Sequence, residues 1–454
     1  MTTCSLDRHG RLAAGGLLLW LLCLLPRPAA AQAQVGAYRP ERPNRAIFQG
    51  GYGTAEQSLI ATGALGVGAG RTVEVTGRGN GTDSMRATST FGHALGSLDY
   101  NFDRERLAAS AGIGGATHYT PSDGGRFTTA TSAHSMLRVA VTRRTTIQGH
   151  ATAALEPLSA LSLLPGLDEG AGVSGALDYG LGFDANRLLR YQAEIGIEQT
   201  LTRRLAVEVG VYRSFAEYTA GSASESVGAV GRLRYQLTRH LSARVGYGRD
   251  AVRIDRGELA GLESADEPDS QFTGERIDAS LDFQQNLSLS RRTTLALNTG
   301  TVMYSQDGRR HYDLTGTATL RREIGRTWYS SVGYTRDAVF VTTLGQPTFT
   351  DSVQATVAGL IGRRVNVNAN AGASHGRLGI EDEDNGYVLY RAGTGMTLGL
   401  TRDLGVSLFY SFFNYRFDQT AELPDALRHR ELSGHAFRVG IDLFLPIYHR
   451  ARRP

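Results

Sequence analysis

The sequence contains no lysine, and its two cysteines, Cys4 and Cys23, both lie close to the N-terminus. The rest of the chain can therefore form neither a disulfide nor a thiolate metal site. The phosphate-binding motif G-x-x-x-x-G-K is excluded because it needs a lysine. All 48 basic residues are arginine, which indicates a compositional bias more than a set of binding sites. The formal net charge is only +4, which is too small to indicate nucleic-acid binding, and we expect no nucleic-acid partner.

The N-terminal segment has the pattern of a secretory signal. Arg8 and Arg11 precede an apolar stretch over residues 12–25, and the segment closes on three alanines at 29–31. This pattern predicts a signal peptide over residues 1–31, which carries three Arg and one Asp, so the secreted chain has a net charge of +2. A membrane anchor is disfavoured because a spanning helix needs about 20 apolar residues. A lipid anchor on Cys23 is disfavoured because Leu22 precedes it where a small residue is required.

Alternation between apolar and polar residues dominates the rest of the chain, which has no other long apolar run. Val207, Val209 and Val211, for example, alternate with Glu208 and Gly210. A period of two over about ten residues predicts strands with two different faces. A soluble sandwich shows the same alternation with its apolar face inward. Strand number and the secretory signal favour a barrel in an outer membrane.

The strand number comes from a recurring short turn that contains arginine. Eight such turns predict sixteen strands, and one more strand at each end gives about 18, within a range of 16–20. The turns are 103–106, 142–144, 202–204, 238–240, 290–292, 325–327, 362–364 and 401–403. The predicted fold is all-β, a transmembrane up-and-down antiparallel β-barrel in the outer membrane of a Gram-negative bacterium.

The predicted organisation has four parts. A signal peptide (1–31) precedes a periplasmic N-terminal segment (32–70), then the outer-membrane β-barrel (71–446) and a basic C-terminal tail (447–454). Residues 57–67 also look like a strand, so the N-terminal segment either includes an extra strand, extends the first strand or pairs on the periplasmic side.

The long connections are expected at the extracellular end, around residues 156–187, 250–275 and 417–433, because such barrels keep their periplasmic turns short. The first contains several leucines, which suit either a constriction folded into the barrel mouth or a lid on its rim. The acidic loop 381–386 has enough carboxylates for Ca²⁺ but lacks the distal Glu of a calcium loop, and a charged hairpin tip is the preferred interpretation.

Function is expected from the lumen, because barrels of 16 to 18 strands can enclose an aqueous channel. Both signs of charge occur on the polar faces, which argues against a filter built from one sign. The asparagines suit a hydroxyl-rich solute, or they only hydrate and brace the wall. The candidate lumen-lining residues are Arg190, Glu194, Glu198, Glu208, Arg232, Arg234, Arg244, Asp278, Asp282, Asp313, Asn366, Asn368, Asn370, Arg438 and Asp442.

Catalytic motifs are missing: the sequence has neither G-x-S-x-G nor H-E-x-x-H. Two Ser-His neighbours, Ser135 beside His134 and Ser374 beside His375, would point to opposite faces of their strands. We therefore expect no enzymatic activity, no cofactor and no metal.

The last predicted strand resembles the recognition signal that barrel-insertion machinery reads. Arg438, Gly440, Leu443 and Leu445 give a polar residue, a glycine and two apolar residues at offsets 0, 2, 5 and 7. The chain departs from the usual pattern because it does not end on an aromatic residue. The expected partners are thus outer-membrane lipid and the assembly machinery.

Turn sequences such as LTRR (201–204), LSRR (289–292) and IGRR (361–364), with the strand RTWYSSVGYTRD (326–337), carry a further resemblance. The chain is similar over residues 71–446 to large outer-membrane β-barrel proteins encoded beside exopolysaccharide export systems in proteobacteria, including myxobacteria. The resemblance implies a conduit for a secreted exopolysaccharide that works with periplasmic export proteins. A general diffusion porin for small solutes and a non-conducting barrel whose loops bind a partner remain alternatives.

Overall fold

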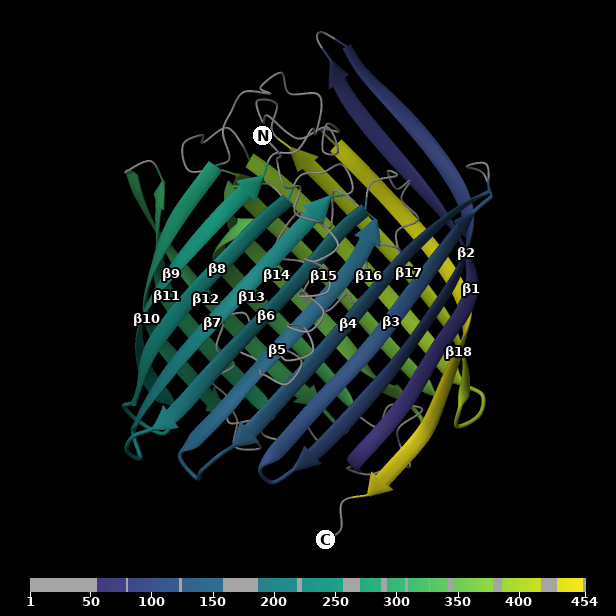
Figure 1. Ribbon diagram of the computed structural model, residues 1–454. Helices are drawn as coiled ribbons and strands as arrows, with labels where there is room; N and C mark the ends of the chain where they lie inside the picture. The colour runs from purple at the N-terminus through teal and green to yellow at the C-terminus, as the bar shows by residue number, and fades with distance from the viewer. Residues whose placement is uncertain are drawn as a thin grey trace, which may run out of the picture.

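The computed structural model describes most of the chain after residue 54 (Figure 1). The described ranges are 55–78, 81–121, 125–157, 187–218, 223–255, 270–286, 292–306, 309–325, 327–341, 346–378, 386–417 and 431–451. The expected signal peptide, the leucine-rich connection and nearly all of the acidic loop 381–386 lie outside these ranges. Among the described residues, no helix has the length and hydropathy that crossing a membrane requires.

The described residues form 18 strands. They are β1 (Ala55–Arg78), β2 (Gly81–Arg104), β3 (Leu107–Thr120), β4 (Arg126–Ala140), β5 (Thr145–Pro157), β6 (Arg187–Thr200), β7 (Leu205–Tyr218), β8 (Ala223–Gln236), β9 (Leu241–Asp255), β10 (Ser270–Asn286), β11 (Thr293–Gln306), β12 (Arg309–Ile324), β13 (Trp328–Val341), β14 (Gln346–Ile361), β15 (Val365–Leu378), β16 (Gly386–Gly399), β17 (Leu404–Phe417) and β18 (Glu431–Ala451).

The sheet is closed. Every strand pairs antiparallel with its neighbours in sequence, and β1 also pairs with β18. Figure 1 shows the resulting barrel of tilted strands. Closure leaves no free sheet edge at membrane depth, where unpaired backbone groups could not be hydrated. The predicted barrel of about 18 antiparallel strands is confirmed.

The eight arginine-bearing turns all fall at connections between consecutive strands, none of them longer than six residues. In four of them a threonine hydroxyl accepts two backbone N–H groups, those two and three residues on: Thr142, Thr202, Thr238 and Thr401. Two others place a glycine at positive φ, Gly325 (66°) and Gly362 (64°), a conformation that suits glycine best. The local sequence at these turns therefore ends one strand and reverses the chain direction, so that the next strand runs antiparallel to it.

The ends of the barrel differ from the expected boundaries of 71–446. β1 begins at Ala55, so residues 57–67 are the lower half of the first strand and not a separate periplasmic element. β18 continues to Ala451, and its Tyr448 pairs with Leu59 of β1. The two terminal stretches pair with each other across the closure of the barrel. The sequence of either strand alone does not reveal this pairing.

The hairpin of β1 and β2 extends beyond the rest of the rim, as the purple ribbons in Figure 1 show. Its pairing continues to Arg78 with Gly81, whereas β2 pairs with β3 only from Gly92 onward. The upper part of β2 therefore has β1 alone as its neighbour.

Candidate functional site: the barrel wall and lumen

The outer face of the wall is apolar and exposed. On β7, Val209 and Val211 are 53% and 49% exposed, and on β9 Val245 is 60% exposed. Similar side chains occur around the whole barrel, including Leu65 and Val67 on β1 and Ile441 on β18. Exposing an apolar belt of this extent to water would be unfavourable, so the belt faces lipid.

The described part of the chain is a closed sheet without helices, and its outer face is apolar. The protein is an outer-membrane β-barrel, a class that Gram-negative bacteria place in their outer membrane. The eight arginine-bearing turns, none longer than six residues, lie at one rim together with the start of β1 and the end of β18, whereas the other rim carries all the longer connections. The first rim is the periplasmic one, because such barrels keep their periplasmic turns short. The long connections then lie at the extracellular rim.

The strand register places the sequence-predicted lumen residues on the opposite face from the apolar belt. Those with described side chains are Arg190, Glu194, Glu198, Glu208, Arg232, Arg234, Arg244, Asp282, Asp313, Asn366, Asn368, Asn370, Arg438 and Asp442. Asp278 shares the backbone register of β10, but its side chain is outside the described part of the structure. Whether these residues contact a solute remains a prediction.

Charges on β6 to β8 are paired across strands. Arg234 Nη2 lies 2.5 Å from Glu198 Oε1, and Arg232 Nη1 lies 3.5 Å from Glu208 Oε1. Each pair joins opposite signs on one wall, so this part of the lumen has little net charge.

A more buried network follows on β9 to β11. The Arg244 guanidinium donates to Ser280 Oγ at 3.0 Å and to Asp282 Oδ1 at 3.0 Å. Asn298 donates to the same carboxylate oxygen. The side chains of Arg244 and Asp282 are each 6% exposed, which makes this pair a brace of the wall more than a solute contact.

Two further charge pairs lie toward the extracellular ends of their strands. Arg190 pairs with Glu156 of β5, and Arg336 of β13 reaches Asp313 of β12 at 3.1 Å. The β12–β13 register ends at Gly316 with Arg336, so Arg336 reaches from the last paired position of β13 to a residue of β12 that lies beyond the register.

The asparagines of β15 lie against glycines of β16. Asn368 and Asn370 pair in register with Gly395 and Gly393, and their side-chain oxygens occupy the space that a Cβ would fill. The glycines thus let the amides lie flat along the wall.

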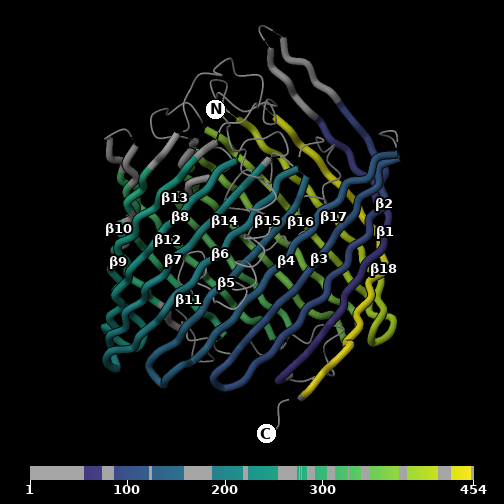
Figure 2. The backbone as a smooth tube through the Cα atoms, in the orientation of Figure 1, coloured from purple at the N-terminus to yellow at the C-terminus, as the bar shows by residue number. Residues whose placement is uncertain are grey.

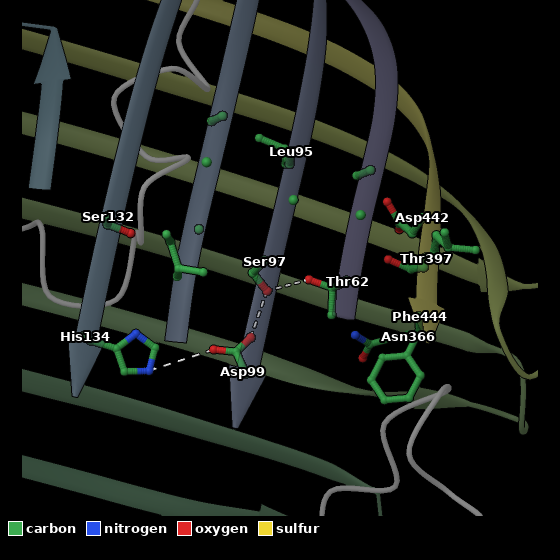
Figure 3. Close-up of a pocket in the computed structure, with 18 residues that line it drawn as sticks. Thr62, Leu95, Ser97, Asp99, Ser132, His134, Asn366, Thr397, Asp442 and Phe444 are labelled. Carbon is green, nitrogen blue, oxygen red and sulfur yellow. Dashed lines mark hydrogen bonds and ion pairs between the residues drawn. The ribbon is translucent and has the colours of Figure 1, made fainter. Parts of the chain in front are cut away.

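A cavity of about 450 Å³ opens on the inner face near the short-turn end. Its lining comes from β1 to β4 on one side and from β15, β16 and β18 on the other (Figure 3). β18 pairs with β1 across the closure, whereas β15 and β16 are separated from β1 by β17 and β18, so their residues reach the cavity across the inside of the barrel.

The cavity lining is rich in hydrogen-bonding groups. Thr62 and Ser97 are joined through their hydroxyls at 2.8 Å, Ser97 donates to Asp99 at 2.8 Å, and His134 Nε2 lies 3.8 Å from the Asp99 carboxylate (Figure 3). Asn366, Thr397, Asp442 and Phe444 complete the wall. The Asp442 carboxylate accepts a hydrogen bond of 2.9 Å from Ser407.

Aromatic residues form a different inner surface on the extracellular half of β16 and β17. The side chains of Tyr387, Leu389, Phe413, Tyr415 and Phe417 are at most 2% exposed. Sequence reasoning missed them because β17 carries apolar residues on both faces, so its alternation does not tell the faces apart. Their register with the polar-inward residues of β18 could have identified them.

Two histidines lie on the inner face of β2 and β3, above the cavity. The ring of His118 stacks on Phe91 at 4.3 Å, and the nearby His93 fills the space beside Gly66. Both are buried. Their packing against an aromatic ring and a glycine gives them a structural place in the wall.

The described residues form no arrangement suited to catalysis or to metal binding. No group of three or more His, Cys, Asp or Glu could hold a metal ion in that part of the chain. Ser374 is buried on the lumenal face while its neighbour His375 is exposed on the other, so this pair cannot act together.

No protein-family model matches the chain, and no curated protein matches it. Among solved structures, the siderophore receptor PirA from Pseudomonas aeruginosa is 11% identical with a TM-score of 0.37, covering 87% of this chain and 81% of that one. OccK11 (OpdR) from Pseudomonas aeruginosa is 10% identical with a TM-score of 0.40, covering 87% and 100%. The FrpB iron transporter from Neisseria meningitidis is 8% identical with a TM-score of 0.43, covering 88% and 82%. Similarity at this level says nothing about a solute.

Proposed function

We propose that this barrel is a channel for a hydroxyl-rich solute and that the solute is a secreted exopolysaccharide. The observation that carries the proposal is the lumenal cavity. Thr62, Ser97 and Thr397 offer hydroxyls and Asn366 an amide, and each of these groups both donates and accepts hydrogen bonds. A sugar hydroxyl also donates and accepts, so each hydroxyl of a polysaccharide can replace a hydrogen bond to water with one to the wall. Phe444 adds an apolar ring surface.

The paired charges of β6 to β11 fit the same cargo. A wall whose arginines face carboxylates does not hold a polymer by one strong charge, and conduction requires binding weak enough for the solute to leave. The resemblance of the turn and strand sequences to barrels encoded beside exopolysaccharide export systems supports this choice of solute. The periplasmic export proteins implied by that resemblance would deliver the polymer at the short-turn rim.

The first test is electrical. We expect the purified barrel to conduct in planar bilayers and its current to be blocked by neutral oligosaccharides added from the short-turn side. The double variant Asn366→Ala and Thr397→Val removes two hydrogen-bonding groups from the cavity. At about 0.5 to 1.5 kcal/mol for each lost bond, it should weaken the block by about fivefold or more. Gln192→Ala, on the lumenal face of β6 away from the cavity, is the matched control and should leave the block unchanged.

The second test separates the alternatives in cells. Deleting the gene should abolish surface polymer and leave the uptake of small sugars and antibiotics nearly unchanged. Normal surface polymer with reduced small-solute uptake would replace the proposal with a general diffusion porin. A barrel that inserts but never conducts would replace it with a surface-binding protein.

A further inference from the structure

The two rims of the barrel carry opposite charge. The eight short turns hold twelve arginines and two acidic residues, whereas the connections at the other rim hold eighteen acidic residues and three arginines. The protein as a whole has a formal net charge of only +4. The small total thus conceals a strongly basic periplasmic rim.

The turns are built so that their arginines extend into solvent. In the four threonine turns, the hydroxyl that accepts two backbone N–H groups fixes the backbone, and the next residue is an exposed arginine: Arg143, Arg203, Arg239 and Arg402. In the glycine turn after β14, Arg363 and Arg364 are exposed. These six side chains are called the arginine rim below.

Each of these turns also carries an exposed aliphatic side chain just before it. Val141, Leu201, Leu237, Ile361 and Leu400 are 43–55% exposed and continue the lipid-facing register of their strands. Each lies only two residues before the first arginine of its turn. The apolar belt therefore ends where the arginine rim begins, at the level of the lipid headgroups.

The short turns follow one another around the barrel at the end that is lowermost in Figure 2. Lipids surround a barrel on all sides, whereas a docked protein covers one sector. The geometry points to the arginine rim as a binding site for the phosphate headgroups of anionic phospholipids in the periplasmic leaflet. Guanidinium groups suit this role because they form paired hydrogen bonds with phosphate oxygens while their stems lie along apolar surface.

The inference rests only on the position of the barrel in the membrane, not on its solute. It is tested with the mature barrel refolded into phosphatidylcholine vesicles that contain trace spin-labelled phosphatidylglycerol or phosphatidylcholine. The spectra give the relative association of each lipid with the protein surface. A headgroup near one basic side chain gains about fivefold in affinity. We expect the wild type to prefer phosphatidylglycerol by at least about threefold at low salt, and the preference to fall at high salt.

The test variant changes Arg143, Arg203, Arg239 and Arg402 to glutamine, and a matched variant changes the same four to lysine. The glutamine variant should lose most of the preference and the lysine variant should keep it. If the fourfold glutamine variant does not fold, the two double variants, Arg143→Gln with Arg203→Gln and Arg239→Gln with Arg402→Gln, should each lose part of it.

Equal association of both lipids with the wild type would overturn the proposal, as would a full preference in a folded glutamine variant. Polygalacturonate added to barrels in phosphatidylcholine vesicles tests the other polyanion. If it binds the wild type but not the glutamine variant, and no lipid preference exists, the arginine rim serves an anionic polymer and the lipid proposal is wrong. Solute block measured on the same variants shows whether the channel proposal stands on its own.

Discussion

An arginine placed on the lipid-facing side of β7 tests which face of the wall is which. Val209 is 53% exposed and lies near the middle of its strand, opposite Ile197 of β6 and Gly231 of β8. Val209→Arg would put a guanidinium into the apolar belt. Such a substitution costs about 2–4 kcal/mol near the bilayer midplane and less toward the interfaces.

The matched control puts the same side chain on the other face. Gln192 of β6 is exposed on the lumenal face, so the arginine of Gln192→Arg remains in water and should cost less than about 1 kcal/mol. Glu208 is a poorer control, because its carboxylate lies 3.5 Å from Arg232 and an arginine there would face a like charge.

Urea titration of the folded barrel in lipid vesicles measures both variants, with the fraction folded taken from the faster gel migration of the unheated form. A difference of 2 kcal/mol changes the folding equilibrium about 30-fold, well within the range of this assay. Equal losses at Val209 and Gln192 would refute the assignment of faces.

Two further pairs of substitutions test the packing and the charge pairs of the wall. Gly228→Ala should destabilise the barrel by about 1–3 kcal/mol, because its Cβ would overlap side chains of β7 and β9, whereas Gly231→Ala on the same strand meets nothing within 4 Å and should be tolerated in the same urea titration. Asp282→Ala should cost about 3–5 kcal/mol of folding free energy, because it leaves the buried charge of Arg244 without its carboxylate. Glu198→Gln, in a partly exposed pair, should cost less than about 1 kcal/mol. Comparable losses of stability in the two variants would show that burial does not govern the strength of these pairs.

The strand count was predictable because two independent signals agree. Alternation defines a strand wherever lipid and water meet opposite faces, as in the run from Leu205 to Val211. The turn signal adds a fixed local cause, the threonine or glycine that reverses the chain. Together they located all eight connections at the periplasmic rim.

The barrel ends were not predictable, because their cause is non-local. Residues 57–70 pair with β2 in a hairpin, but β1 also pairs with residues 447–451 of β18 across the closure, Ser58 with His449 for instance, and no local sequence signal reports that second pairing. Weak alternation at the N-terminal edge reflects its glycines, which carry no side chain to mark a face.

The sequence predicted which side chains face the lumen, but not which of them contact one another. Alternation alone put Arg244 and Asp282 on one side, yet their contact depends on a register between strands that the sequence does not encode locally. The aromatic surface of Phe413, Tyr415 and Phe417 was missed because these side chains, like those on the opposite face of β17, are mostly apolar.

The strands of this chain separate lipid from an aqueous lumen, and spin labels along one strand test this arrangement directly. The chain after residue 31 has no cysteine, so a single introduced cysteine can carry a unique spin label at each position from Val207 to Tyr212 of β7. In lipid vesicles, labels at 207, 209 and 211 should collide mainly with oxygen, and labels at 208, 210 and 212 mainly with a water-soluble nickel complex. Accessibility to the two reagents should therefore alternate with a period of two along the strand. Equal access of the nickel complex to all six positions, or recovery of the chain as a soluble monomer without lipid, would contradict it.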